Sequence, residues 1–259
     1  MIVTELLVGA IVGLIISTTG VGGGIIILPI LTYFFGLNAL AAVATANFLS
    51  MLMKISSSYM HFKMGNIPFK GAMIVLAIML PSTLLASVLV TWIASFPQYQ
   101  LQTEWGINAL VTVAILFSLY LFLQRLFFSL PLKPDAKQHN IKSLLLPAVM
   151  AGIVLGATGV GGGVVVLPLL LRYMQLNIKQ AIGTSIFVTT ILSGTSALAY
   201  AQDGHTDIKL ALILCIGAVF SMPLAKYLLL RLSERTFQLI TLFIIVCSAI
   251  MMSINLFVS

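Results

Sequence analysis

The stretch Thr19-Gly20-Val21-Gly22-Gly23-Gly24-Ile25-Ile26-Ile27-Leu28-Pro29-Ile30-Leu31 decides how this chain folds. It returns 139 positions later as Thr158-Gly159-Val160-Gly161-Gly162-Gly163-Val164-Val165-Val166-Leu167-Pro168-Leu169-Leu170. The same offset matches further pairs, among them Gly13 with Gly152, Asn38 with Asn177, Ala42 with Ala181, Thr45 with Thr184, Phe48 with Phe187 and Gly65 with Gly204. Identity at one fixed spacing over so many positions indicates a tandem duplication.

The composition indicates a membrane protein. Hydrophobic residues make up 60% of the 259 residues and charged residues only 7%, whereas a soluble domain carries about 25% charged residues. Eight apolar runs are long enough to cross roughly 30 Å of hydrocarbon. They are 6–35, 39–62, 71–96, 106–130, 144–173, 181–201, 210–232 and 237–258. The runs lack the alternating pattern of transmembrane strands, so we predict an all-α polytopic membrane protein.

The positive charges predict how these runs are threaded through the bilayer. With eight full crossings, lysine and arginine split only eight to five between the two sides. If runs 6–35 and 144–173 enter the membrane and return, the split becomes twelve to one, with Lys209 alone outside. Each half then has one glycine-broken re-entrant or discontinuous helix and three transmembrane helices, which makes the duplication an inverted repeat. Eight crossings with kinked first and fifth helices are the alternative.

Three regions follow from this threading: a first transmembrane repeat at 1–130, a linker at 131–143 and a second repeat at 144–259. The linker combines two prolines with five ionisable residues and is predicted to be cytoplasmic. Both termini are predicted outside the cell. The first run is not expected to be a signal peptide, because it lacks a basic start and is the partner of run 144–173.

The glycine clusters interrupt their helices, because glycine costs about 1 kcal/mol per helical position relative to alanine. Backbone N–H groups freed at membrane depth need a partner from protein or from a wet cavity. A helix restarting there directs free donors and a positive helix end at that cavity, which favours an anion. Close helix packing by small residues and cation coordination by freed carbonyls are the competing interpretations.

Candidate substrate-binding residues lie at the two breaks and on the apolar runs that follow them. They are Thr19, Gly20, Gly22, Gly23, Gly24, Thr45, Asn47, Lys54, Thr158, Gly159, Gly161, Gly162, Gly163, Thr184 and Ser185. The alternative for Thr45 and Thr184 is hydrogen bonding between helices. Lys54 either balances anion charge in the cavity or extends to the cytoplasmic surface.

The sequence gives little support for an enzyme, a metal site or a nucleic-acid-binding protein. No HExxH or GxSxG pattern and no pair of carboxylates within an apolar run is present, so we predict no enzyme, no metal site and no cofactor. The glycine motif lacks the setting of a dinucleotide fingerprint. The net charge of +7 fits juxtamembrane loops, not nucleic acid. Cys215 and Cys247 both fall within apolar runs, and we expect them to be core residues.

The doubled TGVGGGxxxLPxL motif in a polytopic chain of this length resembles the TauE/SafE family of sulfite exporters, also called the four-toluene sulfonate uptake permease family. The resemblance covers essentially the whole chain. It implies transport of a small anion, such as sulfite, an organosulfonate or another organic anion, across the bacterial inner membrane, usually by export and with coupled protons as one option. The expected partners are that anion and the lipid bilayer. Oligomeric state stays open, because every predicted face is apolar.

Two functional hypotheses follow. The first is a secondary transporter that binds the anion at the paired glycine breaks and works by alternating access. The second is a non-transporting membrane scaffold or assembly protein in which the glycines serve helix packing.

Overall fold

The structure is a computed structural model, which describes residues 2–19, 23–127, 141–160, 165–174, 176–201, 206–231 and 234–258. All the regular secondary structure within these ranges is helical. Residues 131–140 of the predicted linker at 131–143 lie outside the described residues, and the helix that follows begins at Ile141.

The helices of the two halves recur in the same order. The first half contains α1 (Ile2–Thr19), α2 (Gly23–Tyr33), α3 (Ala39–Lys63), α4 (Phe69–Ala94), the short 3₁₀ helix η1 (Pro97–Tyr99) and α5 (Gln100–Phe127). The second half contains α6 (Ile141–Thr158), α7 (Leu167–Tyr173), α8 (Ile178–Ala201), α9 (Ile208–Arg231) and α10 (Glu234–Val258). The first and fifth apolar runs thus each contain two helices, α1 with α2 and α6 with α7.

Matched residues set equivalent helix starts in both halves. Asn38 caps α3 by accepting a hydrogen bond from the backbone N–H of Ala41 at 2.8 Å. Its counterpart Asn177 accepts from the N–H of Gln180 at 2.9 Å, at the start of α8. An asparagine oxygen satisfies one of the donors that the first helical turn leaves free. The duplication therefore preserves local structure as well as sequence.

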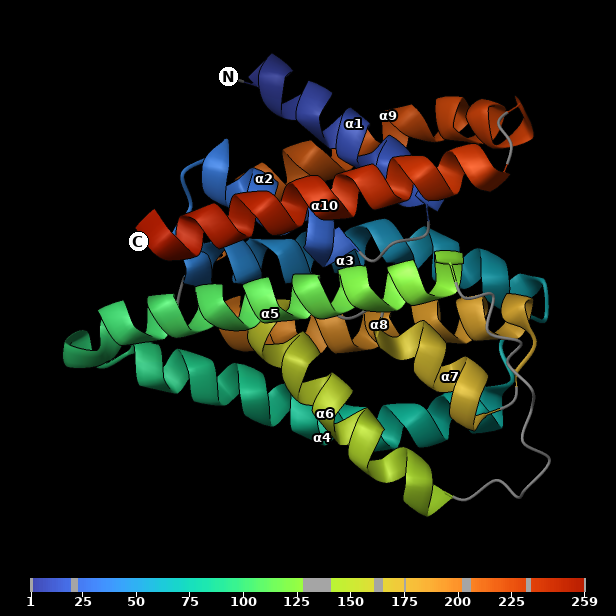
Figure 1. Ribbon diagram of the computed structural model, residues 1–259, viewed down its shortest axis with the longest axis horizontal. Coiled ribbons are helices and arrows are strands. Elements are labelled where there is room, and N and C mark those ends of the chain that lie inside the picture. Colours follow the sequence, from blue (N-terminus) through green and yellow to red (C-terminus); the bar gives the residue numbers. More distant parts are fainter. Residues whose placement is uncertain are drawn as a thin grey trace.

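The two halves are interlocked. Helix α1 packs along α9 from the other half, and α6 packs along α4 in the corresponding way (Figure 1). Two repeat-related glycines permit this approach. A Cβ atom on Gly13 would lie 2.4 Å from the Cβ of Ala218, and one on Gly152 would lie 2.8 Å from the carbonyl oxygen of Met79. Small residues allow the helix backbones to come this close.

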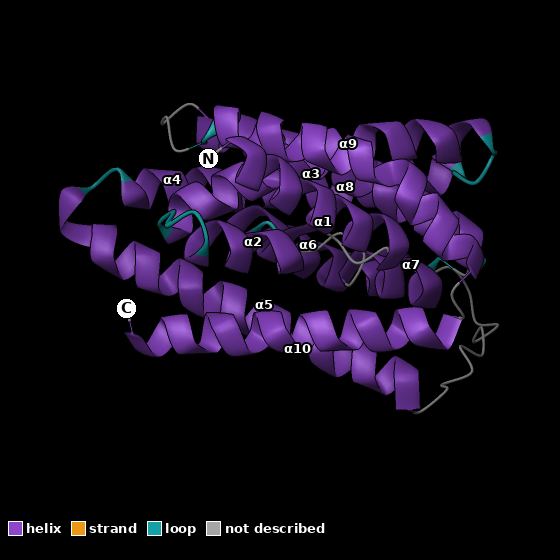
Figure 2. Cartoon of the chain, turned by 90° about the horizontal axis from the view of Figure 1, so that it is seen from above, coloured by secondary structure: helices purple, strands orange, loops and turns teal. Residues whose placement is uncertain are grey.

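Repeat-related helices meet each other in opposite directions. Helix α5 and its counterpart α10 lie side by side and run antiparallel (Figures 1 and 2). Helix α3 and its counterpart α8 pack closely, with Gly183 against Asn66 near one end and Gly194 against Met51 further along. The residue numbers fall along α3 as they rise along α8, so this pair is also antiparallel.

The buried apolar side chains form two clusters that do not follow the sequence halves. The first draws mainly on α1, α2, α3, α5, α9 and α10, and the second mainly on α4, α6, α7 and α8. Helix α4 thus packs with the second half and α9 with the first. Hydroxyl groups tie α6 to its neighbours, since Thr83 of α4 donates to the carbonyl of Gly152 at 3.1 Å and Tyr200 of α8 donates to that of Gly156 at 2.9 Å.

The outer surface is suited to lipid. Large apolar side chains are exposed on several helices, including Leu85 at 67%, Leu198 at 70% and Phe220 at 78%. Four helices of the described chain are long and apolar enough to cross a membrane, namely those spanning 39–63, 69–94, 97–124 and 179–201. Shorter apolar helices accompany them. The prediction of a multi-pass α-helical membrane protein is confirmed.

Candidate functional site

The two glycine-rich stretches touch each other inside the molecule. Helix α2 begins at Gly23, and a Cβ atom on Gly24 would lie only 2.3 Å from the carbonyl oxygen of Gly159. Gly159 follows the end of α6 and has φ +67°, in the left-handed region that favours glycine. We call this contact, formed by Gly23, Gly24, Gly159 and Val160, the glycine junction. Any side chain at Gly24 would collide with backbone there.

Helix α3 supplies polar groups to the glycine junction. Asn47 lies against Gly159, where an added Cβ would be 3.0 Å from the Asn47 amide nitrogen. Ser50 lies against Gly23, where an added Cβ would be 2.9 Å from the Ser50 hydroxyl oxygen. Both residues are buried. The amide nitrogen of Asn47 donates to the carbonyl of Val43 at 3.1 Å, while the Asn47 Oδ1 and the Ser50 Oγ have no hydrogen-bond partner in the part of the chain that the structure describes.

Unsatisfied polar atoms are costly in a buried setting, at about 1–3 kcal/mol each. Each such atom in a folded protein calls for an explanation, and a bound water or ion is one of them. The free Ser50 hydroxyl can donate to an anion, whereas the free Asn47 oxygen can accept from a donor.

Lys54 extends this polar face of α3. Residues 47, 50 and 54 are spaced by three and then four positions, which places them on one side of the helix. The Lys54 side chain is half-buried. Ser50 was not among the predicted site residues, although its spacing from Asn47 and Lys54 was a usable signal. The corresponding positions of α8 are Ile186, Thr189 and Ser193, so both halves place hydroxyls on this face, but only α3 adds an amide and an ammonium group to it.

Several predicted site residues fall outside the described structure. These are Gly20, Gly22, Gly161, Gly162 and Gly163. Thr19 ends α1, and its side chain is likewise not described. Thr158 is buried at the end of α6, where its hydroxyl donates to the carbonyl of Val154 at 2.5 Å and accepts from the N–H of Val160 at 3.1 Å. The Thr158 hydroxyl proton is therefore engaged within its own helix end.

The repeat-related threonines Thr45 and Thr184 lie away from each other. Thr45 accepts a hydrogen bond from the backbone N–H of Asp207 at 3.0 Å, beside the start of α9. Thr184 and Ser185 lie near the opposite end of the antiparallel α3–α8 pair, next to Gly183 and the Asn66 backbone. The residue that corresponds to Asp207 is Pro68, which has no N–H. Among the described residues, the buried Thr184 hydroxyl has no hydrogen-bond partner.

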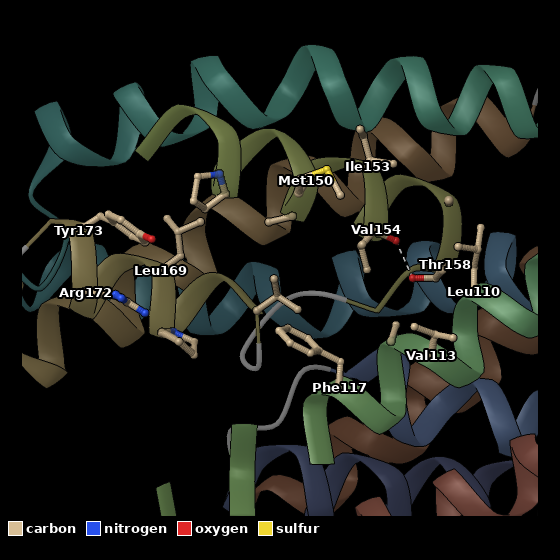
Figure 3. Close-up of a pocket in the computed structure, with 16 residues that line it drawn as sticks. Leu110, Val113, Phe117, Met150, Ile153, Val154, Thr158, Leu169, Arg172 and Tyr173 are labelled. Atoms are coloured by element: carbon tan, nitrogen blue, oxygen red, sulfur yellow. Dashed lines mark hydrogen bonds between the residues drawn. The ribbon is translucent and has the colours of Figure 1, made fainter. Parts of the chain in front are cut away.

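A cavity of about 460 Å³ opens between α5, α6 and α7. Figure 3 shows Arg172 and Tyr173 at one end and Thr158, beside the glycine junction, at the other. The walls between them are apolar and include Phe117, Met150 and Leu169. The Arg172 guanidinium carbon lies 5.7 Å from the centre of the Tyr173 ring, within the range of a cation–π interaction. The sequence prediction contained neither Arg172 nor this cavity.

Antiparallel apolar helices and a lipid-compatible surface define a polytopic membrane protein, and buried polar groups at helix ends fit a transport protein. The family comparison agrees with that class. The chain belongs to the sulfite exporter TauE/SafE family, whose model matches residues 6–252. The resemblance inferred from the doubled motif is thereby confirmed, and with it a transporter, not an enzyme.

Curated relatives cover almost all of the chain. A probable membrane transporter protein of Bacillus subtilis, YjnA, is 28% identical over 255 residues, 96% of this chain and 99% of the relative. The probable membrane transporter protein MJ0441 of Methanocaldococcus jannaschii is 24% identical over 249 residues, covering 89% of this chain and 87% of the relative. A probable membrane transporter protein of Haemophilus influenzae is 29% identical over 77% of this chain and 73% of the relative. No solved structure matches the chain.

Proposed function

We propose that this protein is a secondary transporter that exports a small anion, sulfite or an organosulfonate, across the bacterial inner membrane. The description of its family, sulfite exporter, supports this substrate class and direction. The names of its relatives support transport without specifying a substrate.

The proposed binding site is the glycine junction together with Asn47, Ser50 and Lys54 of α3. The observation that carries the proposal is the buried, unpartnered Ser50 hydroxyl beside the first residue of α2. The hydroxyl donor lies beside the start of α2, where the helix dipole favours negative charge. Lys54, one turn further along the same face, supplies a positive charge. The proposal also keeps the remaining predicted contacts, which are Thr19, Gly20, Gly22, Thr45, Thr158, Gly161, Gly162, Gly163, Thr184 and Ser185.

The proposed mechanism is alternating access within an inverted repeat. The antiparallel pairing of α3 with α8 and of α5 with α10 supports inversion, because parallel repeats would not place counterparts in opposite directions. Gly23 lies near Ile16, whereas Leu31 shares a lining with Val8. Helices α1 and α2 therefore run in opposite directions, as a re-entrant hairpin would. Under this proposal the linker is cytoplasmic and both termini are outside.

Transport by purified protein in liposomes tests this function. We expect wild type to accelerate the movement of sulfite or an organosulfonate down its gradient, and Ser50→Ala to lose most of that flux. Thr189→Ala is the matched control, because Thr189 occupies the corresponding place in α8 and its hydroxyl already bonds to the carbonyl of Ser185 at 2.8 Å. Equal flux in Ser50→Ala and wild type would contradict the proposed site.

One observation favours the scaffold as a second candidate. Gly24 meets the backbone of Gly159 so closely that packing alone would require glycine there. A scaffold predicts that folded protein in liposomes moves no anion faster than protein-free liposomes do. Substrate-dependent flux would therefore separate the two functions.

A further inference from the structure

The spaces beside the two helix hairpins differ, although the duplication makes them counterparts. Val8, Val12 and Ile30 line the space on the α1–α2 side. Their counterparts at the repeat offset are Pro147, Ala151 and Leu169, and all three line the cavity between α5, α6 and α7. The first space has no room for a water molecule, whereas the second measures about 460 Å³. One side of the molecule is thus closed and the other open.

The way that α2 packs against α10, and that α7 faces α5 across the cavity, accounts for the difference between the closed and the open side. On the closed side, α10 packs against α2, and the Tyr33 hydroxyl donates to the backbone carbonyl of Met251 at 2.5 Å. The counterpart of Tyr33 is Arg172. On the open side Arg172 makes no such link in the described structure; it is exposed and lines the cavity (Figure 3). Tyr33 therefore links α2 to α10, whereas at the matching place in the second half Arg172 lines an open cavity.

The walls of the cavity restrict what it can hold. A water molecule needs only about 10–15 Å³ of such space, so an inorganic oxyanion would leave most of the cavity unfilled. Apolar side chains form the walls, and Arg172 supplies a cation at one end. A permanently charged guanidinium suits a sulfonate or carboxylate head, while the apolar walls favour a hydrocarbon body.

We propose that the cavity between α5, α6 and α7 is the open access route of the transporter, taken by an organic anion with an apolar body past Arg172 to Thr158, while Tyr33 closes the counterpart route. The proposal rests on the transport function above and adds to it the route, the gate and the substrate class. The opposite-facing state exchanges the two arrangements, with the α2–α10 side open and the α5–α7 side closed.

Thiol labelling tests the route without measuring transport. The starting protein carries Cys215→Ala and Cys247→Ala, which remove both native thiols, and is reconstituted in phospholipid bilayers. Ala151→Cys places a thiol in the cavity wall, and Val12→Cys places the matched thiol on the closed side. We expect an anionic sulfonatoethyl thiosulfonate to label Ala151→Cys on the order of tenfold faster, because the closed side reacts only during rare openings. Equal rates, or faster labelling of Val12→Cys, would overturn the route.

Two further variants test the gate and the charge. Tyr33→Phe removes the bond to Met251 and should raise the labelling rate of Val12→Cys several-fold. Arg172→Gln should slow the anionic reagent several-fold while a cationic thiosulfonate of similar size is not slowed. An unchanged labelling rate in the Tyr33→Phe variant would contradict the gate, and an unchanged rate in the Arg172→Gln variant would contradict the role of the charge. Labelling does not depend on transport. If the cavity is labelled faster than the closed side but the protein moves no anion, the transport function is rejected, while the difference between the open and the closed side still holds.

Protection from labelling tests the substrate class. An arene sulfonate should slow labelling of Ala151→Cys at concentrations where sulfite and sulfate do not, since only the organic anion fills the apolar walls. Equal protection by the inorganic anions would contradict an apolar body. Labelling in detergent that disappears in a phospholipid bilayer would identify a lipid chain as the occupant and overturn the access route.

Discussion

At the residue scale, the duplication allows the same side chain to be compared in two settings. Thr45 and Thr184 are counterparts and both are fully buried. Thr45 accepts the N–H of Asp207, whereas the counterpart of Asp207 is Pro68 and the Thr184 hydroxyl has no partner within the described ranges. The pair isolates the value of one hydrogen bond between halves.

Replacing each threonine with valine should therefore have unequal effects. Thr45→Val removes the acceptor of the Asp207 N–H and should cost about 1 kcal/mol of stability. Thr184→Val removes a buried hydroxyl for which the described residues supply no partner, and should be neutral or stabilising. Thermal unfolding of the two purified variants beside wild type provides the measurement. A larger loss in Thr184→Val would show that its hydroxyl has a partner that matters, as a substrate contact or otherwise.

The sequence identified some residues of the candidate site and missed others. Glycine clusters in an apolar run identified where helices end, because backbone conformation there is a local property. Asn47 stood out because an amide is unusual in an apolar run. Ser50 and Arg172 did not, since serine is common in membrane helices and arginine at a helix end fits a juxtamembrane position. Their significance depends on what other elements lie beside them.

At the element scale, close helix contacts depend on glycines whose roles differ widely. A Cβ on Gly152 of α6 would lie 2.1 Å from the Ser82 hydroxyl oxygen and 2.8 Å from the carbonyl oxygen of Met79 in α4. A Cβ on Gly106 of α5 would meet nothing within 4 Å. One glycine is required by packing and the other is not.

Alanine substitutions at these positions form a matched pair. Gly152→Ala should destabilise the protein by about 1–3 kcal/mol, because α6 must move away from α4. Gly106→Ala should be neutral or stabilise by up to about 1 kcal/mol, because alanine favours the helix. Thermal unfolding in one detergent compares them. Equal stability of the two variants would contradict the close packing of α6 on α4.

Element order was accessible from the sequence, and element pairing was not. The repeat offset, which matches Asn38 with Asn177, predicted equivalent helices in both halves. That α4 packs with the second half and α9 with the first could not be predicted, because apolar residues surround each helix and identify no partner. The packing of α10 against α2 and the cavity between α5 and α7 have no sequence signature either.

At the scale of the whole molecule, the central structural question is how the chain crosses the bilayer. Two re-entrant hairpins place the N-terminus and the α3–α4 turn on opposite sides, whereas eight full crossings place them on the same side. Met64 lies in that turn and is exposed, so it reports the side directly.

Side-specific labelling distinguishes the two topologies. In a protein without native cysteines, Met64→Cys should react with an impermeant thiol reagent from the cytoplasmic side only. A tag at the N-terminus should be accessible from the outside only, because run 6–35 returns to its own side. Access to both from the same side would contradict the hairpins and favour eight crossings.

The central claim is that an anion binds at the glycine junction beside Ser50 and Lys54, and thermal stability in a panel of anions tests it most directly. The panel contains sulfite, thiosulfate, sulfoacetate, taurine and an arene sulfonate, with chloride as control. A ligand at about 100 times its Kd adds close to 2.7 kcal/mol to the unfolding free energy. We predict selective stabilisation of wild type and Thr189→Ala by sulfite or a sulfonate, lost in Ser50→Ala and Lys54→Gln. Undiminished stabilisation in both of these variants, or none in folded wild type, would contradict the account.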